Sequence, residues 1–322
     1  MSNHVIGSSL ALITAMSWAA GVIFFKKSGE SMSPFALNFF KNTVAVALFA
    51  VTFVVMNETL WEPDWGWDLF WLMFSGVIGI GISDVLFFRS LHIVGASRSA
   101  VIETLYSPSV LLSAFLLLGE RMSAYTALGG GFILLGIGLV VTSKSSDVPE
   151  GKRLSRGELI DGVLTGVVSV IAMAISIVAV KPIIEAHTVL WATTMRLSGG
   201  LLIMIAALPF VPTFRRETRT ALVPHAGWRY AIPGAFFGTY IALFSWIGGY
   251  KYTTATVASL LNQTSTLFIV AAATLFLGET LTRRRAIAVA LALGGSLIVL
   301  LTSGPESTPT ANEPIAAVET VP

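Results

Sequence analysis

Two basic residues of this sequence lie deep inside apolar stretches, where a charge is costly. Lys41 is seven residues into the stretch 34–55, and Arg196 is eight residues into the stretch 188–208. In a helix, each charge would lie roughly 10–12 Å from the helix start. A cation at that depth in a membrane costs about 2.5–3.5 kcal/mol and needs a compensating role. Both are candidates to attract the carboxylate of a small molecule; snorkelling to the surface or a structural bond to backbone carbonyls is the alternative.

Asp84 and Glu103 are the acids nearest to the interior of apolar stretches. We place both near the ends of their stretches, beside Arg89 and Arg98 in the short connection between them. The favoured interpretation is an ion-pair cluster at the membrane surface that holds two helices together. A proton relay or recognition of an ammonium group is the alternative, since ionisable residues inside membranes often mark transport pathways.

Four residues near the middle of two further stretches are candidates to line a cavity: Tyr106, Pro108, Asn262 and Gln263. Pro108 has no N–H to donate, so it leaves a carbonyl free about one turn earlier. Such a break is tolerated in a membrane where other helices or a water-filled cavity satisfy the backbone. We expect these segments to offer hydrogen bonds to a zwitterion; polar contact between helices is the alternative.

Aromatic residues form a third group of candidates. Trp18 and Tyr240 lie too deep in their stretches for the membrane surface, so they are candidates to stack on an aromatic ligand, with Trp246 as a weaker one. Trp and Tyr are also frequent at membrane–water interfaces. We assign to an interface four tryptophans around the start of the third stretch: Trp61, Trp65, Trp67 and Trp71.

Composition identifies the elements that must position these residues. Of the 322 residues, 54% are hydrophobic and 12% are charged, and mean hydropathy is +0.79. A soluble protein this apolar could not cover its surface with polar side chains, which excludes a soluble enzyme, a nucleic-acid binder and a disordered regulator. Zero cysteines and four scattered histidines argue against a disulfide scaffold or a metal site. The net charge of +2 indicates no polyanionic partner.

Ten charge-poor stretches have the length of a membrane-spanning helix, about 20 residues. A β-barrel strand would instead show about ten residues of alternation. The chain is therefore predicted to be an all-α integral membrane protein that contacts the lipid bilayer. The stretches are 5–25, 34–55, 68–89, 98–118, 124–142, 160–180, 188–208, 229–250, 254–277 and 285–302.

The two halves of the sequence resemble each other. Gly119-Glu120 follows the fourth stretch and Gly278-Glu279 follows the ninth, 159 residues later; these glutamates are expected to cap or end their helices. Earlier in each half the offset is 155, which matches Lys41 with Arg196 and favours a shared structural role for them. A unit of five helices is odd, so its second copy enters the membrane from the opposite side. We predict ten transmembrane helices as two inverted five-helix repeats, an architecture common in secondary transporters.

Domain boundaries follow from this duplication. The first repeat is predicted to take residues 1–143 and the second residues 160–303, with a basic connecting loop at 144–159. Residues 304–322 carry Pro, Thr and Glu without apolar periodicity, so they are predicted to form a disordered tail.

Basic residues predict the orientation in the membrane. Fifteen of the 20 Lys and Arg lie in or beside loops 1–2, 3–4, 5–6, 7–8 and 9–10, counted by helix, whereas three lie in the other connections. Loops rich in Lys and Arg stay on the cytoplasmic side. These five loops are therefore predicted to be cytoplasmic, and both termini outside, in a bacterial-type cell inner membrane.

Common catalytic and nucleotide-binding motifs are absent from the sequence. It contains no GxxxxGK[ST] P-loop, no HExxH zinc motif and no GxSxG elbow. We therefore expect neither an enzyme nor a cofactor. Transport would run on gradients or on energy from another chain.

The arrangement of these features resembles the drug/metabolite transporter superfamily, and more narrowly its EamA-type exporters. The resemblance covers residues 5–303 and rests on the five-plus-five helices, Trp18 in the first helix, a basic residue in the second helix of each half and Gly-Glu closing the fourth. It is greatest to the YddG-type aromatic amino-acid exporters, which implies export and an aromatic substrate. Two features depart from the relatives. Family members commonly keep both termini cytoplasmic, and small four-helix relatives carry a glutamate in their first helix that 5–25 lacks.

These inferences predict an exporter that works by alternating access, with two halves rocking about a central, mostly apolar site. The expected substrate is an aromatic or other hydrophobic amino acid, whose ring buries apolar area while its zwitterion takes the hydrogen bonds. One chain holds both halves, so a monomer would suffice. Alternatives with the same fold carry a drug, a nucleoside, a threonine-like amino acid or a sugar phosphate. From other classes, a non-saturable channel or a lipid-handling protein remains open.

Overall fold

The described part of the chain is helical. The computed structural model describes residues 3–59, 66–118, 154–253, 255–278 and 282–302, with isolated positions between 124 and 139. Helices of the first half are α1 (Asn3–Ser28), α2 (Pro34–Met56), α3 (Gly66–Gly76), the π-helix η2 (Val77–Ile82), α4 (Ser83–Val94), α5 (Ala96–Glu103) and α6 (Tyr106–Leu118). Helices of the second half are α8 (Arg156–Val178), α9 (Lys181–Ala186), α10 (Val189–Ala207), α11 (Pro212–Leu222), α12 (Trp228–Ala235), the π-helix η4 (Phe236–Ile241), α13 (Ala242–Tyr252), α14 (Ala255–Gln263), α15 (Ser265–Leu277) and α16 (Arg283–Thr302).

These helices have the lengths and apolar sequences that a membrane requires. Seven are long and apolar enough to cross a bilayer, and two shorter apolar helices follow at Leu261–Leu277 and Ala286–Gly295. They correspond to the predicted stretches apart from the fifth, and the all-α membrane fold is confirmed. Outside the described residues lie most of the stretch 124–142, most of the basic connection, and Glu120, Glu279 and residues 304–322.

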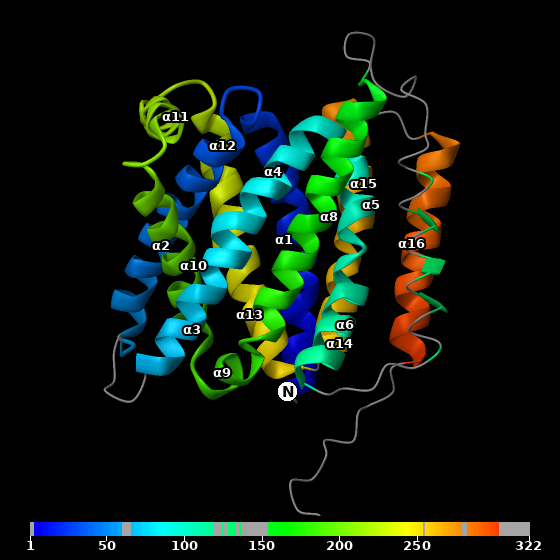
Figure 1. Cartoon of the computed structure of the whole chain (residues 1–322). Helices are drawn as coiled ribbons and strands as arrows, with labels where there is room; N and C mark the ends of the chain where they lie inside the picture. The colour runs from blue at the N-terminus through cyan, green and yellow to red at the C-terminus, as the bar shows by residue number, and fades with distance from the viewer. Residues whose placement is uncertain are drawn as a thin grey trace, which may run out of the picture.

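The two halves cross the bundle in opposite directions. In Figure 1, α1 rises from the N-terminus at the lower edge, whereas α8, the first helix of the second half, descends toward α9. The broken helix α5–α6 also runs opposite to its counterpart α14–α15. The inverted relation of the repeats, which the sequence predicts from parity, is therefore visible in the helix directions.

Irregular turns follow the same repeat. The third span changes to a π-helix at Val77–Ile82 and the eighth span at Phe236–Ile241, 159 residues later. The fourth span breaks between α5 and α6, and the ninth breaks at Thr264 between α14 and α15. Single π-turns inside α-helices are frequent at functional sites. Because both kinds of interruption occur at matched positions, they belong to the repeat unit itself.

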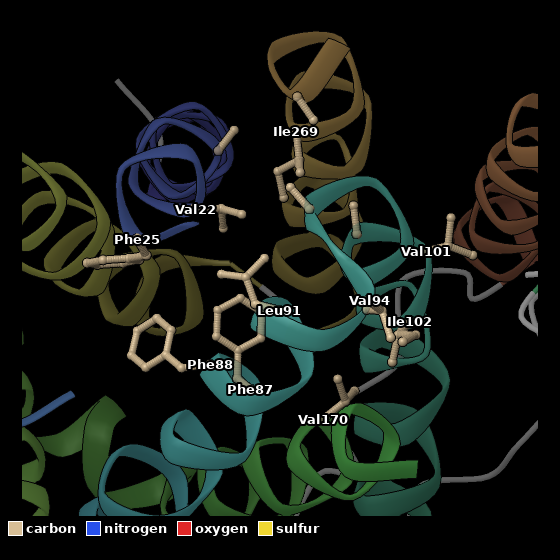
Figure 2. Packing of buried hydrophobic residues seen from close by; sticks show 14 of the residues in the cluster. Val22, Phe25, Phe87, Phe88, Leu91, Val94, Val101, Ile102, Val170 and Ile269 are labelled. Atoms are coloured by element: carbon tan, nitrogen blue, oxygen red, sulfur yellow. The ribbon is translucent and has the colours of Figure 1, made fainter. Parts of the chain in front are cut away.

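Apolar side chains fill the contact between α1 and α4. Figure 2 shows Phe25 of α1 beside Phe88 of α4, and the two rings meet edge to face with centroids 5.1 Å apart. The outer faces are apolar as well: Val54 is 81% exposed and Leu275 is 78% exposed. Lipid is as apolar as such a core, so close packing rather than the hydrophobic effect must hold the helices together.

Glycines provide this close packing where the halves meet. A Cβ on Gly76 of α3 would lie 1.8 Å from the carbonyl oxygen of Arg196 in α10. A Cβ on Gly21 of α1 would lie 2.3 Å from the Cα of Gly238 in η4. Both distances are far inside van der Waals contact, so a larger residue would push the helices apart.

The connection between the third and fourth spans is shorter than the sequence predicts. α4 continues to Val94 and α5 begins at Ala96, so the single residue Gly95 joins them, with φ of 85°. Glycine adopts positive φ without steric cost. Asp84 and Glu103 therefore lie inside the bundle, and their predicted place in a cluster at the membrane surface is wrong.

Exposed aromatic residues gather at the start of α3. Trp67 is 69% exposed and Trp71 is 36% exposed, and their rings form an edge-to-face pair with centroids 5.7 Å apart. This exposure is what an interfacial position requires. Trp61 and Trp65 lie outside the described residues.

Changing Gly76 tests whether the α3–α10 contact holds the halves together. We expect Gly76→Ala to lower the free energy of unfolding by about 1–3 kcal/mol, because the added methyl overpacks a backbone contact. Denaturant titration of the purified protein in micelles measures this. Gly294→Ala is the matched control, since a Cβ there meets no atom of the described residues within 4 Å. Equal stability of the two variants would contradict the role of Gly76.

Candidate functional site

A cavity of about 160 Å³ lies inside the bundle, with walls from both halves. A buried water needs about 10–15 Å³ on the same measure, so the cavity has room for roughly a dozen waters or a small organic molecule. Its lining comes from the middle of the spans and includes both π-helices and both helix breaks.

The lining repeats across the two halves. Nine positions of the first half face nine matched positions of the second half at the two offsets found in the sequence. At offset 155 these are Thr14 and Ser169, Ala15 and Val170, Trp18 and Met173; at offset 159 they are Ile80 and Thr239, Ser83 and Ala242, Asp84 and Leu243, Phe87 and Trp246, Glu103 and Asn262, Tyr106 and Ser265. Lys41, Gly238 and Gln263 complete the set. The cavity therefore lies on the pseudo-two-fold axis that relates the repeats.

Aromatic rings form two walls of the cavity. The ring of Trp18 lies 5.3 Å from that of Phe87, and the ring of Tyr106 lies 6.3 Å from that of Trp246. The hydroxyl of Tyr106 is 2.7 Å from the hydroxyl of Tyr250 behind it, which fixes the ring. Of the predicted aromatic candidates, Trp18, Tyr106 and Trp246 therefore line the cavity.

The break in the fourth span has the cause that the sequence predicts. Pro108 lacks the N–H that would bond the carbonyl of Thr104 one turn earlier. The side-chain amide of Gln263 donates to that carbonyl at 3.3 Å, to the carbonyl of Glu103 at 3.4 Å and to the hydroxyl of Ser107 at 3.1 Å. Gln263 of the ninth span thus satisfies the backbone that Pro108 frees in the fourth.

Two further hydrogen bonds join the broken spans symmetrically. The hydroxyl of Ser107 donates to the carbonyl of Ser259 at 3.2 Å, and the hydroxyl of Thr266 donates to the carbonyl of Ala100 at 3.4 Å. Donors and acceptors are both related by the offset of 159. The fourth and ninth spans therefore cross on the pseudo-two-fold axis, next to the cavity.

Lys41 lines the cavity, but its charge is already compensated. Its Nζ donates to Oδ2 of Asp84 at 2.7 Å and to Oδ1 of Asn42 at 2.8 Å. Arg89 does not join the predicted ion-pair cluster with Asp84, since it binds Asp161 at 2.9 Å on the exposed surface. The pair with Asp84 explains how a cation is kept at this depth without a bound anion.

Arg196 lies behind the cavity wall and is fully buried. Its Nε donates to the hydroxyl of Ser75 at 2.7 Å, and one terminal nitrogen donates to the hydroxyl of Ser176 at 3.2 Å. The guanidinium lies over the ring of Trp246, 5.3 Å from its centroid. Trp246 thus separates this charge from the cavity, and Arg196 binds helices of both halves.

Glu103 ends α5 at the helix break and lines the cavity. Its Oε2 accepts a hydrogen bond from the indole N–H of Trp18 at 3.0 Å. Its Oε1 is buried and has no hydrogen-bond partner among the described residues. The predicted neighbour Arg98 is buried in the same helix, at 2% exposure.

Besides Arg196, two predicted residues do not line the cavity. Pro108 acts through the break that it causes. Tyr240 turns toward the second span, where its hydroxyl is 2.6 Å from that of Thr52 and its ring lies 4.7 Å from that of Phe49. The preceding residue of η4, Thr239, faces the cavity instead.

Three apolar residues of the lining were not among the predicted candidates. Ala15, Val170 and Met173 are ordinary helix residues. A signal for Met173 exists, because the offset of 155 matches it with Trp18, and the same signal matches Ala15 with Val170. Applying the repeat to every candidate, rather than to the charges alone, would have found Met173.

Polar contacts join the two halves on both sides of the cavity. Beside α9, the imidazole Nε2 of His187 is 2.7 Å from Oδ2 of Asp68. At the opposite end of the bundle, the hydroxyl of Ser33 donates to Oε2 of Glu217 at 2.6 Å. Polar contacts therefore hold the two halves together at both ends of the bundle.

A helical membrane bundle with inverted halves, discontinuous helices and a cavity at their crossing has the architecture of a secondary transporter. The chain belongs to the EamA-like transporter family, whose model matches residues 5–142 and 160–301. The two matches coincide with the two halves of the fold, so each half is one family unit.

Individual relatives agree with this family. A protein of Haemophilus influenzae named "Uncharacterized transporter" is 27% identical over 135 residues, which is 42% of this chain and 44% of that protein. The chain thus matches less than half of that relative's length. A protein of known crystal structure is similar with a TM-score of 0.66 at 17% identity, over 92% of this chain and 96% of that one, which shows the shared fold.

Removing the amide of Gln263 should destabilise the fold through the break at Pro108. We expect Gln263→Leu to lower the free energy of unfolding by about 1–3 kcal/mol, because buried carbonyls lose their donor. Adding Pro108→Ala returns a backbone N–H to the same turn, so the double variant should lose less stability than the two single losses added together. Denaturant unfolding in micelles measures all three variants.

Pro182→Ala is the control for this cycle, since Pro182 lies in α9, away from the break. Combined with Gln263→Leu it should give strictly additive losses. Additive losses for Pro108→Ala as well would show that Gln263 and the proline break act independently.

The Lys41–Asp84 pair should be strongly coupled. Removing one partner leaves a buried charge uncompensated, so Lys41→Met or Asp84→Leu should each cost about 3–5 kcal/mol of stability. The double variant should recover most of that loss, because Leu is the residue that the repeat already places at the matched position 243. The exposed pair Arg89–Asp161 is the control and should contribute at most about 1 kcal/mol. A double variant as unstable as the sum of the single ones would refute the coupling.

Proposed function

We propose that this protein exports aromatic or other hydrophobic amino acids across the inner membrane by alternating access. The observation that carries the proposal is the cavity at the crossing of the halves, walled by Trp18, Phe87, Tyr106 and Trp246. Small-molecule sites are mostly apolar and hold a few placed polar groups. The rings suit the apolar side chain of the substrate, and the polar groups at the helix breaks suit its charged end.

The charges around the cavity disfavour a sugar phosphate as cargo. A phosphate would need free cations, yet Lys41 is paired with Asp84 at 2.7 Å and Arg196 lies behind Trp246. Glu103 adds an acid to the lining. The arrangement fits a zwitterion or a neutral solute better than a dianion, which supports the amino acid over this alternative.

Alternating access is supported by the position of the irregular turns. The two π-helices contribute Ile80 and Thr239 to the cavity, and the two breaks contribute Glu103 and Asn262. Interrupted helices are points where a bundle can bend without losing a regular hydrogen-bond ladder. Because these points are related by the pseudo-two-fold axis, the same bend in either half would open opposite sides.

The orientation that we propose places the basic end of the bundle in the cytoplasm. The α1–α2 connection, the α4–α5 connection and α11 all lie at the upper end in Figure 1. Lys27 lies in the last turn of α1, Arg89 lies in α4 before its connection to α5, and Arg215 lies in α11. Both termini would then lie outside, and a single chain would act as the transporting unit.

Transport by proteoliposomes containing the purified chain tests the function. We expect saturable flux of labelled tryptophan and phenylalanine above that of empty vesicles, and little flux of a sugar phosphate. Threonine, measured in parallel, tests whether the ring is required. Flux that rises without saturation would favour a channel, and no flux of any solute would remove the substrate assignment and favour a lipid-handling role.

Filling the cavity should abolish this flux without unfolding the protein. Met173→Trp places a large ring opposite its counterpart Trp18, inside the cavity. Ile171→Trp is the control, because Ile171 lies on the same helix with 41% exposure on the outer face. Loss of flux in the first variant alone links transport to the cavity. Equal flux in both would show that the cavity is not the path.

A further inference from the structure

We propose that Glu103 is the receptor for a protonated amine, so that the cavity takes aromatic cations in preference to aromatic anions. The inference deepens the proposed function because it concerns the same cavity. It names the end of the ligand that the site recognises first, and it extends the ligand class to aromatic amines that have no carboxylate.

Only one of the two carboxylate oxygens of Glu103 has a hydrogen-bond partner among the described residues. The indole N–H of Trp18 donates to Oε2 at 3.0 Å, which fixes the orientation of the group. Oε1 is buried and accepts no hydrogen bond from the described residues. A buried acceptor without a donor is costly, and the cost is greater for a charged one. The site is therefore incomplete until a donor enters.

The other charged groups of the lining cancel each other. Of the lining residues, only Lys41, Asp84 and Glu103 have an acidic or basic side chain, and the first two form an ion pair. Glu103 takes part in no ion pair among the described residues. The lining therefore carries one uncompensated acid, and a cation is the ligand charge that it favours.

Nearby polar groups offer further acceptors. The Oδ1 of Asn262, the repeat counterpart of Glu103, is buried without a partner. The side-chain amide of Gln263, which could have donated to a carboxylate, is used at the helix break. An ammonium group has three N–H donors to share among such acceptors.

The helix ends at the breaks do not decide the charge of the ligand. α5 and α14 end beside the cavity, and their carbonyl ends favour a cation. α6 and α15 begin there, at Tyr106 and Ser265, and their N–H ends favour an anion. Because the two effects oppose each other, side chains decide, and Glu103 is the acid among them.

The aromatic walls complete a site for an aromatic amine. The ring of Trp18 lies next to the carboxylate that its N–H binds, and Phe87 packs against it at 5.3 Å. An ammonium at Glu103 would touch these ring faces, which attract cations. The apolar body of the ligand would extend toward Tyr106 and Trp246.

Binding of three matched ligands tests the proposal on the full-length protein in micelles. Tryptamine has the amine alone, indole-3-propionate has the carboxylate alone, and tryptophan has both. Calorimetric titration should show tryptamine binding at least tenfold more tightly than indole-3-propionate. Glu103→Gln should weaken tryptamine at least tenfold and leave indole-3-propionate unchanged or tighter, since glutamine keeps an acceptor for Trp18 but loses the charge.

Glu30→Gln is the matched control, because it removes the same charge from a side chain that is 68% exposed. It should leave the affinities of all three ligands unchanged. Tryptamine binding to Glu103→Gln with wild-type affinity would overturn the proposal, as would a wild-type preference for indole-3-propionate.

A second measurement keeps the proposal falsifiable if Glu103→Gln does not fold. Wild-type protein is treated with a hydrophobic carbodiimide, and modification of the peptide that contains Glu103 is followed by mass spectrometry. Tryptamine should protect this residue and indole-3-propionate should not, and equal modification with both would overturn the proposal. Failure of the amino-acid export is a separate result, because tryptophan flux can be absent while tryptamine still binds at Glu103.

Discussion

A backbone carbonyl that loses its helical partner inside a membrane has no water to replace it, and this constraint organises the centre of the protein. Pro108 releases the carbonyl of Thr104, and Gln263 supplies the missing donor from the opposite half. The fourth and ninth spans are thereby tied at the point where both are broken. The cavity exists because two interrupted helices cross there instead of two regular ones.

Charged side chains inside the bundle must likewise find their partners within the protein. Lys41 and Arg196 occupy matched positions, yet each finds a different partner: Asp84 for the first, and two serines with the ring of Trp246 for the second. Close helix contacts make this possible, since Gly76 lies against the backbone at Arg196. Lys41 therefore needs no bound anion to remain in the membrane, and its depth in the sequence was a stronger indication of the fold than of ligand binding. Arg196 is held by neutral groups, and its Nη1 is buried with no hydrogen-bond partner among the described residues.

Much of the fold was accessible from the sequence, because apolar length and the five-helix repeat are local or additive signals. The break at Pro108 followed from residue type, and seven of the ten candidate residues line the cavity. Five of them were predicted to do so: Trp18, Lys41, Tyr106, Asn262 and Gln263. The other two, Asp84 and Glu103, had been assigned to the membrane surface. What could not be predicted depends on partners far apart in the chain. Asp84 was placed in a surface cluster with the nearer Arg89 and Arg98, whereas helix packing brings it to Lys41. The rotation of η4 turns Tyr240 away from the cavity and exposes Thr239 to it.

The helices of the two halves are symmetric, whereas the side chains of the cavity are not. The symmetric helices serve the movement, and the asymmetric side chains orient the ligand. The repeat relates the two π-helices, the two helix breaks and the hydrogen bonds of Ser107 and Thr266. A bundle that opens alternately to two sides needs such equivalent halves. Glu103, in contrast, faces Asn262, its counterpart in the other half. A symmetric pair of acids would repel each other across a narrow cavity and favour no direction in the ligand. One acid among neutral groups gives the cavity a polar end, so that a ligand with one charged group and one ring can bind in a single orientation while the walls around it move.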